Sequence, residues 1–542
     1  MGRARRRKQE RRAAKRQEVP LQQLVGIVER AKSGPLGEAD YATLKTAIDT
    51  LAVLTQEIQA KGTSIERLRK LLFGASTEKT SRVVGDDAKT GTSESDGKKP
   101  KPPGHGRNGA AAYTGAKKIK VPHAMLHHGD ACPECQKGKI YPLSEPATLV
   151  RVVGVAPLEA TLYECDRLRC NLCGEVFTAP APAGVGDEKY DETASSMIGL
   201  FKYGAGLPFN RIEKLQAGFG VPLPAATQWE IVERAAKQME PAHDELAHQA
   251  AQAKLLHNDD TSAKILELGS SPTETPDDYA RTGVFTSAIV AENDQHRIAL
   301  FFTGPKHAGE NLADVLAERA VTLAAPIQMC DALSRNLPGE LKTILANCIC
   351  HARRRFVEVA NDFPDEVRHL LETLREVYKT DALAREKALS TEERLRLHQS
   401  ASAPLMNALE EWLREQIDEH KVEPNSGLGE AIGYMRKHWP ELTLFLRVPG
   451  APLDNNICER ALKKAILHRK NALFYKTQNG AHVGDVFMSL IHSAELNGAS
   501  AFDYLVALQR HHEEVATNPR EWMPWSYQTT VARLTDGRAP PG

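Results

Sequence analysis

The sequence predicts a multidomain protein of the α+β class, built around one α/β layer that a block of helices interrupts. Five short apolar runs, often β-branched, have the composition of strands, and a helix candidate at 311–320 precedes the fourth run. From residue 353 to 447 the strand signals stop and the sequence is almost wholly helical. Three strands, a helix, a fourth strand, more helix and a fifth strand is the order of a ribonuclease-H-like layer. The apolar runs lie at 254–257, 284–291, 298–303, 326–329 and 344–350.

Composition bounds the class of protein. The formal net charge of the 542 residues is zero, yet nine of the first sixteen are Arg or Lys, which suits a polyanion partner or, alternatively, a solvated tail. No apolar run reaches the ~20 residues of a membrane span, and we see no signal peptide, so we expect no membrane partner. Four of the nine cysteines have metal-binding spacing, which fits a reducing cytoplasm better than a disulfide scaffold.

Shifts in composition divide the chain into successive parts. We expect a basic arm (1–37), a coiled-coil or dimerisation helix (38–75), a linker (76–119), a zinc-binding domain (120–182), a helix-turn-helix-like helical domain (190–245), the first part of the ribonuclease-H-like catalytic core (250–356), a helical insertion (357–450), the last part of the core (451–511) and a C-terminal tail (512–542).

The helix predicted from residue 38 onward has apolar residues mostly three and four positions apart, the spacing of a short coiled coil. Self-association is the functional interpretation, and packing on its own chain is the alternative. Between 190 and 245, a helix, a glycine-containing turn and a second helix indicate a DNA-binding helix-turn-helix or an ordinary helical hairpin.

Two Cys-x-x-Cys pairs form the most specific local signal in the chain. Four thiolates around one tetrahedral Zn²⁺ leave no position open for water, so the zinc they predict is structural. Extended runs at 147–155 and 160–166 between the pairs fit a zinc ribbon with a long hairpin. Unliganded structural cysteines are the alternative for the four residues, which are Cys132, Cys135, Cys170 and Cys173.

Carboxylates stand at the ends of two apolar runs and at the start of a late helix. Asp259 follows the first run, with Asp260 as its competitor; Asp331 follows the fourth run. Glu459 opens a helix rich in Arg and Lys, and Asp454 before it has the position of a helix cap. Three carboxylates on three elements can converge on a pair of divalent cations, and oxygen ligands favour Mg²⁺.

Basic residues cluster near these carboxylates. Some follow the fifth strand, where contact with DNA phosphates competes with a salt-bridged helix start, and others follow Glu459 within about three helical turns. With one arginine of the helical domain, the predicted nucleic-acid contacts are Arg211, His351, Arg353, Arg354, Lys463, Arg469 and Lys470.

Several motifs occur in a fixed order along the chain: Leu71-Leu72-Phe73-Gly74 with Thr77-Glu78-Lys79, the two cysteine pairs, His257-Asn258-Asp259-Asp260-Thr261, Cys350-His351-Ala352-Arg353-Arg354-Arg355-Phe356, Asp454-Asn455-Asn456 with Glu459-Arg460, Arg469-Lys470-Asn471 with Leu473-Phe474, and Leu496-Asn497-Gly498 with Met523-Pro524-Trp525. In this combination the chain resembles the insertion-sequence-66 family of bacterial transposases over nearly its whole length. It departs from that family at Asp260, where Glu is usual, and after Asp331, where an aromatic residue is usual.

The resemblance implies a transposase whose acidic triad falls on Asp259, Asp331 and Glu459, with Mg²⁺ or Mn²⁺ at the catalytic site. It implies metal-dependent DNA cleavage and strand transfer, binding to double-stranded terminal inverted repeats and target DNA, a homodimer or higher oligomer, and accessory proteins from the same element, all in the bacterial cytoplasm at the nucleoid. Two alternatives stay open: a metal-dependent nuclease of the same fold that does not join DNA, and a catalytically inactive DNA-binding regulator.

Overall fold

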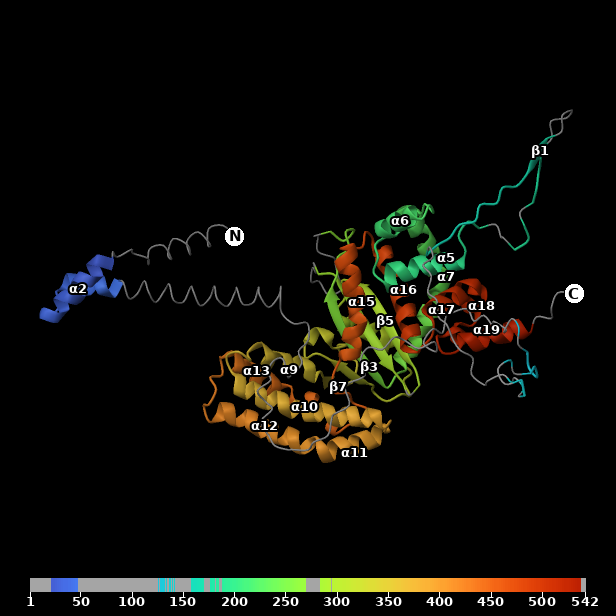
Figure 1. Cartoon of the computed structure of the whole chain (residues 1–542). Coiled ribbons are helices and arrows are strands. Elements are labelled where there is room, and N and C mark those ends of the chain that lie inside the picture. Colours follow the sequence, from blue (N-terminus) through green and yellow to red (C-terminus); the bar gives the residue numbers. More distant parts are fainter. Residues whose placement is uncertain are drawn as a thin grey trace. The chain divides into compact units, whose positions relative to one another are not determined.

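The computed structural model describes residues 21–46, short stretches between 125 and 184, residues 188–269 and 283–293, and residues 295–537 (Figure 1). The chain divides into two compact units, Met1–Ala88 and Lys89–Gly542. The linker and the four cysteines of the predicted zinc site (Cys132, Cys135, Cys170 and Cys173) lie outside the described residues, as do residues 1–20 of the predicted basic arm.

In the first unit, helix α2 (Leu21–Ser33) is followed by helical residues at 38–46. Arg30 links the two segments through paired hydrogen bonds to Asp40, with nitrogen–oxygen distances of 2.8 Å. The predicted dimerisation helix therefore begins as a helix at residue 38, and its continuation beyond residue 46 lies outside the described part.

A five-stranded mixed sheet forms the centre of the second unit, in the order β5-β4-β3-β6-β7. Strand β3 pairs antiparallel with β4 and parallel with β6; β5 adds antiparallel to β4, and β7 adds parallel to β6. The five predicted strands are confirmed in position and order. Their bounds are β3 (Leu255–Ser262), β4 (Phe285–Glu292), β5 (Arg297–Gly304), β6 (Ile327–Cys330) and β7 (Ile344–Asn347).

Four details of the prediction were wrong. Strand β3 runs to residue 262 because β4 pairs with it along its whole length, although only its first two residues, Leu255 and Leu256, are apolar. Only a short 3₁₀ turn, Ser334–Asn336, stands where more helix was expected between the fourth and fifth strands. The fifth strand ends at Asn347, and a helix starts at residue 349. Residues 160–166 are irregular; the nearby two-stranded ladder joins β1 (Arg167–Arg169) to β2 (Val176–Thr178).

Helices cover the sheet. Helix α8 (Ala308–Ala317) packs on β3 and β4. The helix predicted at 311–320 is present, and it starts and ends three residues earlier than predicted. Helix α15 (Asn456–Ala472) also packs on β3 and β4, and α16 (Gln478–Leu496) packs on β5 (Figure 1). The apolar core that they share includes Ile289, Leu300, Leu462, Phe487 and Leu490.

Helix α16 supplies hydrogen bonds to the outer edge of β5. The backbone N–H groups of Ala299, Phe301 and Thr303 donate to side-chain oxygens of Ser493, Ser489 and Asp485, at 3.0, 3.0 and 2.6 Å. Four helical residues rise about 6 Å, and two strand residues rise about 6.6 Å, so the two ladders match. Unpaired N–H groups on an edge strand invite pairing with another chain, and α16 removes that risk.

The helical insertion packs as a group beside the sheet (Figure 1). Its buried side chains include Leu370, Leu374, Val377, Met406 and Leu413, so the expected helical block is confirmed. Its elements are α9 (Ile349–Glu358), α10 (Pro364–Glu386), α11 (Thr391–Ala401), α12 (Ala403–Asp418), α13 (Gly427–Lys437), α14 (Trp439–Leu442) and the 3₁₀ turn Leu444–Leu446.

Helices at both ends of the second unit join the same core. Trp522, 1% exposed, stacks on His511 and anchors the C-terminal residues to this core. In the part of the chain that the structure describes, no helix combines the length and apolar character needed to cross a bilayer. These terminal elements are α5 (Glu192–Gly199), a π-helical turn (Leu200–Gly204), α6 (Phe209–Gly218), α7 (Ala225–Ala251), α17 (Ala501–Arg510), α18 (His512–Thr517), a 3₁₀ turn (Pro519–Trp522) and α19 (Tyr527–Asp536).

Candidate active site

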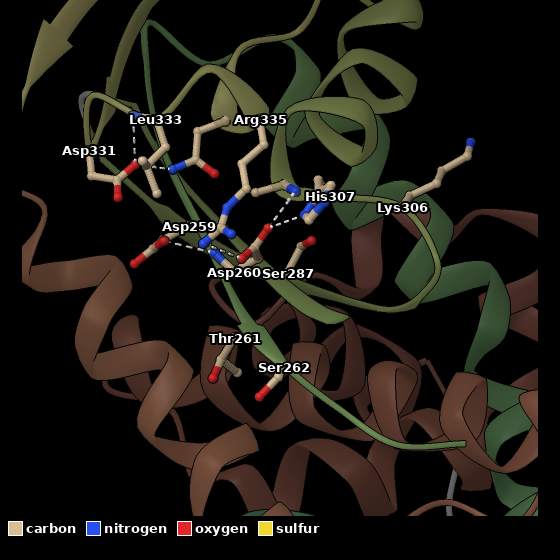
Figure 2. Close-up of polar contacts among 12 residues, drawn as sticks. Asp259, Asp260, Thr261, Ser262, Ser287, Lys306, His307, Asp331, Leu333 and Arg335 are labelled. Atoms are coloured by element: carbon tan, nitrogen blue, oxygen red, sulfur yellow. Dashed lines mark hydrogen bonds and ion pairs between the residues drawn. The ribbon is translucent and has the colours of Figure 1, made fainter. Parts of the chain in front are cut away.

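The three predicted carboxylates come from three neighbouring elements. Asp259 lies on β3 opposite Ala288 of β4, and Asp331 directly follows β6. Because β3 and β6 run parallel and their pairing ends at His257 and Met329, both carboxylates lie just beyond the same end of that pairing. Glu459 lies in the first turn of α15, which packs on β3. Figure 2 shows Asp259 and Asp331 on the same side of strand β3.

The carboxylates lie close enough for their charges to affect the pKa of Asp259. Burial raises the pKa of Asp259 to about 7, and the negative charge of Asp331 is the next cause; Asp260 and Glu459 raise it further. The backbone N–H of Asp260, which donates to Asp259 Oδ1 at 2.8 Å, lowers the same pKa without offsetting these effects. A cation placed among the carboxylates would relieve the repulsion.

Asp260 points away from this group, because successive strand side chains face opposite sides of a sheet. Its side chain is 1% exposed and lies 2.8 Å from His307 Nδ1 and 3.3 Å from Arg335 (Figure 2). Asp260 therefore ties β3 to α8 and to the turn after β6. Of the two competitors named from the sequence, the geometry favours Asp259 as the residue that faces Asp331.

A buried polar network supports Asp331. The side chain of Asn336 donates to Asp331 Oδ1, and the backbone carbonyl of Asn336 accepts from Asn258 Nδ2 at 2.8 Å and from Gln328 Nε2 at 2.7 Å. Gln328 also donates to Asn258 Oδ1 at 2.9 Å. Asn258, Gln328 and Asn336 are 0% exposed, so these bonds form away from water and hold the loop after β6 in one place.

A second buried chain of bonds joins β3 to the start of α15. His257 Nδ1 lies 3.0 Å from Asn455 Oδ1, and Asn455 Nδ2 donates to the backbone carbonyl of Asn258 at 3.1 Å. On its other side, His257 Nε2 lies 3.1 Å from Glu292 Oε1. Burial alone would raise the pKa of Glu292, but His257 and Arg297 outweigh it and hold this pKa at about 2.

The side chains of Glu459 and Asp454 have different surroundings. Asp454 Oδ1 accepts from the backbone N–H of Asn456 at 3.1 Å, and its other oxygen lies 3.8 Å from Cys350 Sγ. It therefore supports the helix start, as its capping position predicted. Glu459 Oε1 is buried and has no hydrogen-bond partner among the described residues. His351 Nδ1 lies 3.7 Å away from it.

The chemistry of the predicted ligands suits the divalent cation that the sequence predicts, although among the described residues Asp259, Asp331 and Glu459 do not bring three ligand atoms within 4.8 Å of one another. Glu459 Oε1 is an orphaned buried acceptor, the donor atoms are carboxylate oxygens, and like charges crowd Asp259. Hard oxygen donors of this kind suit Mg²⁺ or Mn²⁺. Asp259, Asp331 and Glu459 are the residues that would hold it.

The predicted phosphate contacts occupy different environments. Arg211, Lys463 and Lys470 are exposed, on α6 and α15. Arg469 instead donates to Ser262 Oγ at 2.7 Å and to Thr261 Oγ1 at 3.1 Å, which ties α15 to the end of β3. Arg353 and Arg354 lie partly buried on α9, and His351 of the same helix faces Glu459 rather than solvent.

Comparison with known proteins places this chain in a family. The model of the family described as Transposase IS66 family matches residues 189–483, more than half of the 542-residue chain. The chain belongs to the IS66 transposase family. The uncharacterized protein y4jD of Sinorhizobium fredii is 25% identical over 525 residues, which cover 90% of this chain and 98% of the relative. The uncharacterized protein y4hP of the same organism is 25% identical over 515 residues, with 86% and 88% covered.

The matched IS66 region contains Asp259, Asp331 and Glu459 together with the polar residues that support them. The resemblance stated from the sequence is thus confirmed at the level of the family. Sequence reasoning missed the supporting residues Gln328 and Asn336, because a single polar residue in an apolar run or a loop carries no motif. Asn258 and Asn455 lay inside quoted motifs, and those motifs were the available signal.

Proposed function

We propose that this protein is a DNA transposase that cuts at the ends of an insertion sequence and joins those ends to target DNA. One observation carries the proposal: carboxylates from β3, from the end of β6 and from the first turn of α15 lie close enough that the charges of Asp331 and Glu459 add to burial, the largest cause, in raising the pKa of Asp259 to about 7. Membership of the IS66 transposase family supports the same function. The strand order β5-β4-β3-β6-β7, with only β4 reversed, supports a ribonuclease-H-like catalytic core.

Each protein group has a defined task in this chemistry. Asp259, Asp331 and Glu459 would hold the cations, and the chemistry supplied at the site would be activation of the attacking hydroxyl and neutralisation of charge on the scissile phosphate. The Asn336 side chain and the Asp260 N–H orient Asp331 and Asp259. The attacking groups are water for cleavage and the freed 3′-hydroxyl for joining, so the reaction needs no protein nucleophile.

DNA would be bound by exposed cations around this site. Lys463 and Lys470 on α15 follow Glu459, so they are suited to hold the backbone of the strand being cut. Arg211 on α6 belongs to the helical domain at 190–245, which we assign to the terminal inverted repeats. The predicted zinc-binding domain and the basic arm would add contacts, and the N-terminal helix would pair two copies so that both ends of the element are held together.

The test is cleavage of a duplex that carries an element end, in Mg²⁺, with binding measured in parallel. Asp259→Asn should abolish cleavage and leave end binding within about twofold, because one neutralised carboxylate removes a cation ligand but no DNA contact. Asp314→Asn, an exposed carboxylate on α8 that pairs with Lys306, is the matched control and should cleave like the unchanged protein. Cleavage by Asp259→Asn at the normal rate would refute the site assignment.

A pre-cut end separates the proposal from its alternatives. A transposase joins such an end to a target duplex, whereas a nuclease of the same fold cuts without joining. An inactive regulator binds ends and does neither. Strand-transfer products that depend on Asp259 are therefore the expected result.

A further inference from the structure

The start of helix α9 meets the start of helix α15 at three chemically different side chains. Cys348 is the residue before α9, His351 lies in its first turn, and Glu459 lies in the first turn of α15. One ligand atom from each lies within 4.8 Å of the other two. Among the described residues, no other group of three His, Cys, Asp or Glu side chains brings its ligand atoms this close together.

Two of these atoms lack hydrogen-bond partners. His351 Nδ1 and Glu459 Oε1 are buried, lie 3.7 Å apart, and have no partner among the described residues. A separation of 3.7 Å is too long for a hydrogen bond between them. Buried polar atoms normally have a hydrogen-bond partner. Two such atoms without a partner, facing each other at 3.7 Å, leave room for a ligand that both could bind.

The donor set selects the kind of ligand. We propose that Cys348, His351 and Glu459 bind a thiophilic divalent cation of the Zn²⁺ and Co²⁺ class. A thiolate, an imidazole and a carboxylate are the ligands that these ions take, with a water as fourth ligand, whereas Mg²⁺ prefers oxygen alone. This site differs in chemistry from the oxygen site at Asp259 and Asp331, and shares Glu459 with it.

The backbone already holds the three ligands in place. The N–H of Asn455 donates to Cys348 Sγ at 3.3 Å, the type of outer bond that supports a metal-bound thiolate. The N–H of Ile349 donates to the carbonyl of Leu453 at 3.0 Å, so the two helix starts are joined directly. The ligands are therefore set by the fold and need no rearrangement of either helix.

Cys350 provides a matched contrast. Its sulfur lies 3.1 Å from Tyr378 Oη, 3.8 Å from Asp454 and 3.7 Å from Asn456 Nδ2, and it also hydrogen-bonds with the thiol of Cys348, but it does not belong to the three-ligand group. Two cysteines two residues apart, with similar surroundings in the chain, thus have different roles in the proposal. Only Cys348 is a ligand.

Sharing Glu459 has a regulatory consequence. A thiophilic cation on Cys348 and His351 would engage a carboxylate that the cleavage reaction needs, so Zn²⁺ should inhibit in competition with Mg²⁺. This consequence rests on the proposed function, whereas the binding site itself does not.

The experiment is a Co²⁺ titration of the full chain, followed by the thiolate-to-cobalt charge-transfer absorption. The unchanged protein and Cys350→Ser should show the same absorption, and Cys348→Ser should lack one increment of it. The predicted zinc cysteines remain in all three proteins, so their contribution cancels in the difference. Equal titrations of the unchanged protein and Cys348→Ser, or a loss in Cys350→Ser instead, would overturn the proposal.

A second variant decides the matter if Cys348→Ser does not fold, as judged by circular dichroism. His351→Gln keeps the thiol and should weaken Co²⁺ binding at least about tenfold; unchanged affinity would show that His351 and Glu459 only form an ion pair. Asp259→Asn should keep the absorption while losing Mg²⁺-dependent cleavage. If Asp259→Asn loses the cobalt absorption and also loses cleavage, the site proposed here is refuted. If it keeps both the absorption and cleavage, the proposed function is refuted.

Discussion

The side chain of Asn336 donates a hydrogen bond to Asp331, and the backbone carbonyl of the same Asn336 accepts two further bonds from strands β3 and β6. One residue thus joins a predicted cation ligand to the buried part of the sheet. The loop after β6 runs from residue 331 to residue 343, and its leucines Leu333, Leu337 and Leu341 stay 41%, 40% and 40% exposed. The polar bonds of Asn336 therefore hold Asp331 in place.

We predict that Asn336→Ala impairs cleavage through Asp331. The substitution removes the donor to Asp331 and leaves the backbone bonds in place, so the protein should still fold, with a cost of about 1–3 kcal/mol in the free energy of unfolding. Cleavage measured against Mg²⁺ concentration should need more Mg²⁺ than the unchanged protein. An identical Mg²⁺ dependence would show that Asp331 is held by other groups.

Gly309 on α8 is predicted to tolerate no side chain. A Cβ at this position would overlap the carbonyl oxygens of Leu337 and Arg335, in the loop that also contains Asn336. Gly309→Ala should therefore lower the melting temperature markedly and reduce cleavage. Gly433→Ala on α13 is the control: its Cβ meets no atom within 4 Å, so it should be neutral or stabilise by up to about 1 kcal/mol. A fall in stability in both variants would point to a general cost of Ala rather than to this contact.

Asp485 should make the protein less stable as pH rises. Burial raises its pKa from 3.8 to about 7, despite two hydrogen bonds from Thr303. Between pH 3.8 and pH 7 the folded chain keeps a proton on Asp485 that the unfolded chain has lost. The contribution of Asp485 to the free energy of unfolding is therefore complete below pH 3.8 and is lost as pH rises through 7. Asp485→Asn should flatten the slope, as measured by urea unfolding across this range. The same pH dependence of stability in both proteins would contradict the assignment to Asp485. Asp259 is present in both proteins, so its own contribution to the pH dependence cancels in the comparison.

Glu292 should act in the opposite direction. Hydrogen bonds and charges from His257 and Arg297 overcome burial and lower its pKa from 4.5 to about 2. Its contribution to stability is complete above pH 4.5 and is lost as pH falls toward 2. Glu292→Gln should therefore resist acid unfolding with a shallower pH dependence but start from lower stability. Acid titration followed by tryptophan fluorescence measures this; a steeper curve in the variant would be the contrary result.

Two neighbouring cations on α15 should behave differently in DNA binding. Lys470 is exposed, so Lys470→Ala should leave folding intact and lower the salt dependence of binding by about one phosphate contact, a slope change of about 0.9. Arg469 is bonded to Thr261 and Ser262, so Arg469→Ala should also lower thermal stability. Equal melting temperatures for the two variants would mean that the contacts of Arg469 contribute nothing to the fold.

The sheet could be predicted because its strands are apolar runs with clear limits, and the order of five strands and one helix followed from reading them in turn. The second half of β3 could not be predicted in this way. Residues 259–262 are polar, and they are a strand because β4 supplies partners for every one of them. Tertiary pairing set this boundary, and local composition could not reveal it.

The site was predictable in its carboxylates and not in their surroundings. Asp259, Asp331 and Glu459 were found from motifs at the ends of strands and the start of a helix. The opposite orientations of Asp259 and Asp260 depend on strand register, which the predicted end at residue 257 left undefined. The meeting of Cys348 and His351 with Glu459 joins segments more than a hundred residues apart, separated by the whole helical insertion, and only the fold brings them together.

The covering of strand β5 by helix α16 also constrains how the protein is made. Thr303 emerges from the ribosome 182 residues before Asp485, the residue that caps its N–H. At ordinary translation speeds this interval lasts about 10–40 s. During that time a nascent chain carries an open strand edge, which neighbouring chains on the same message can pair with. Premature termination anywhere in the helical insertion should therefore yield an insoluble fragment, even though the strands themselves are complete.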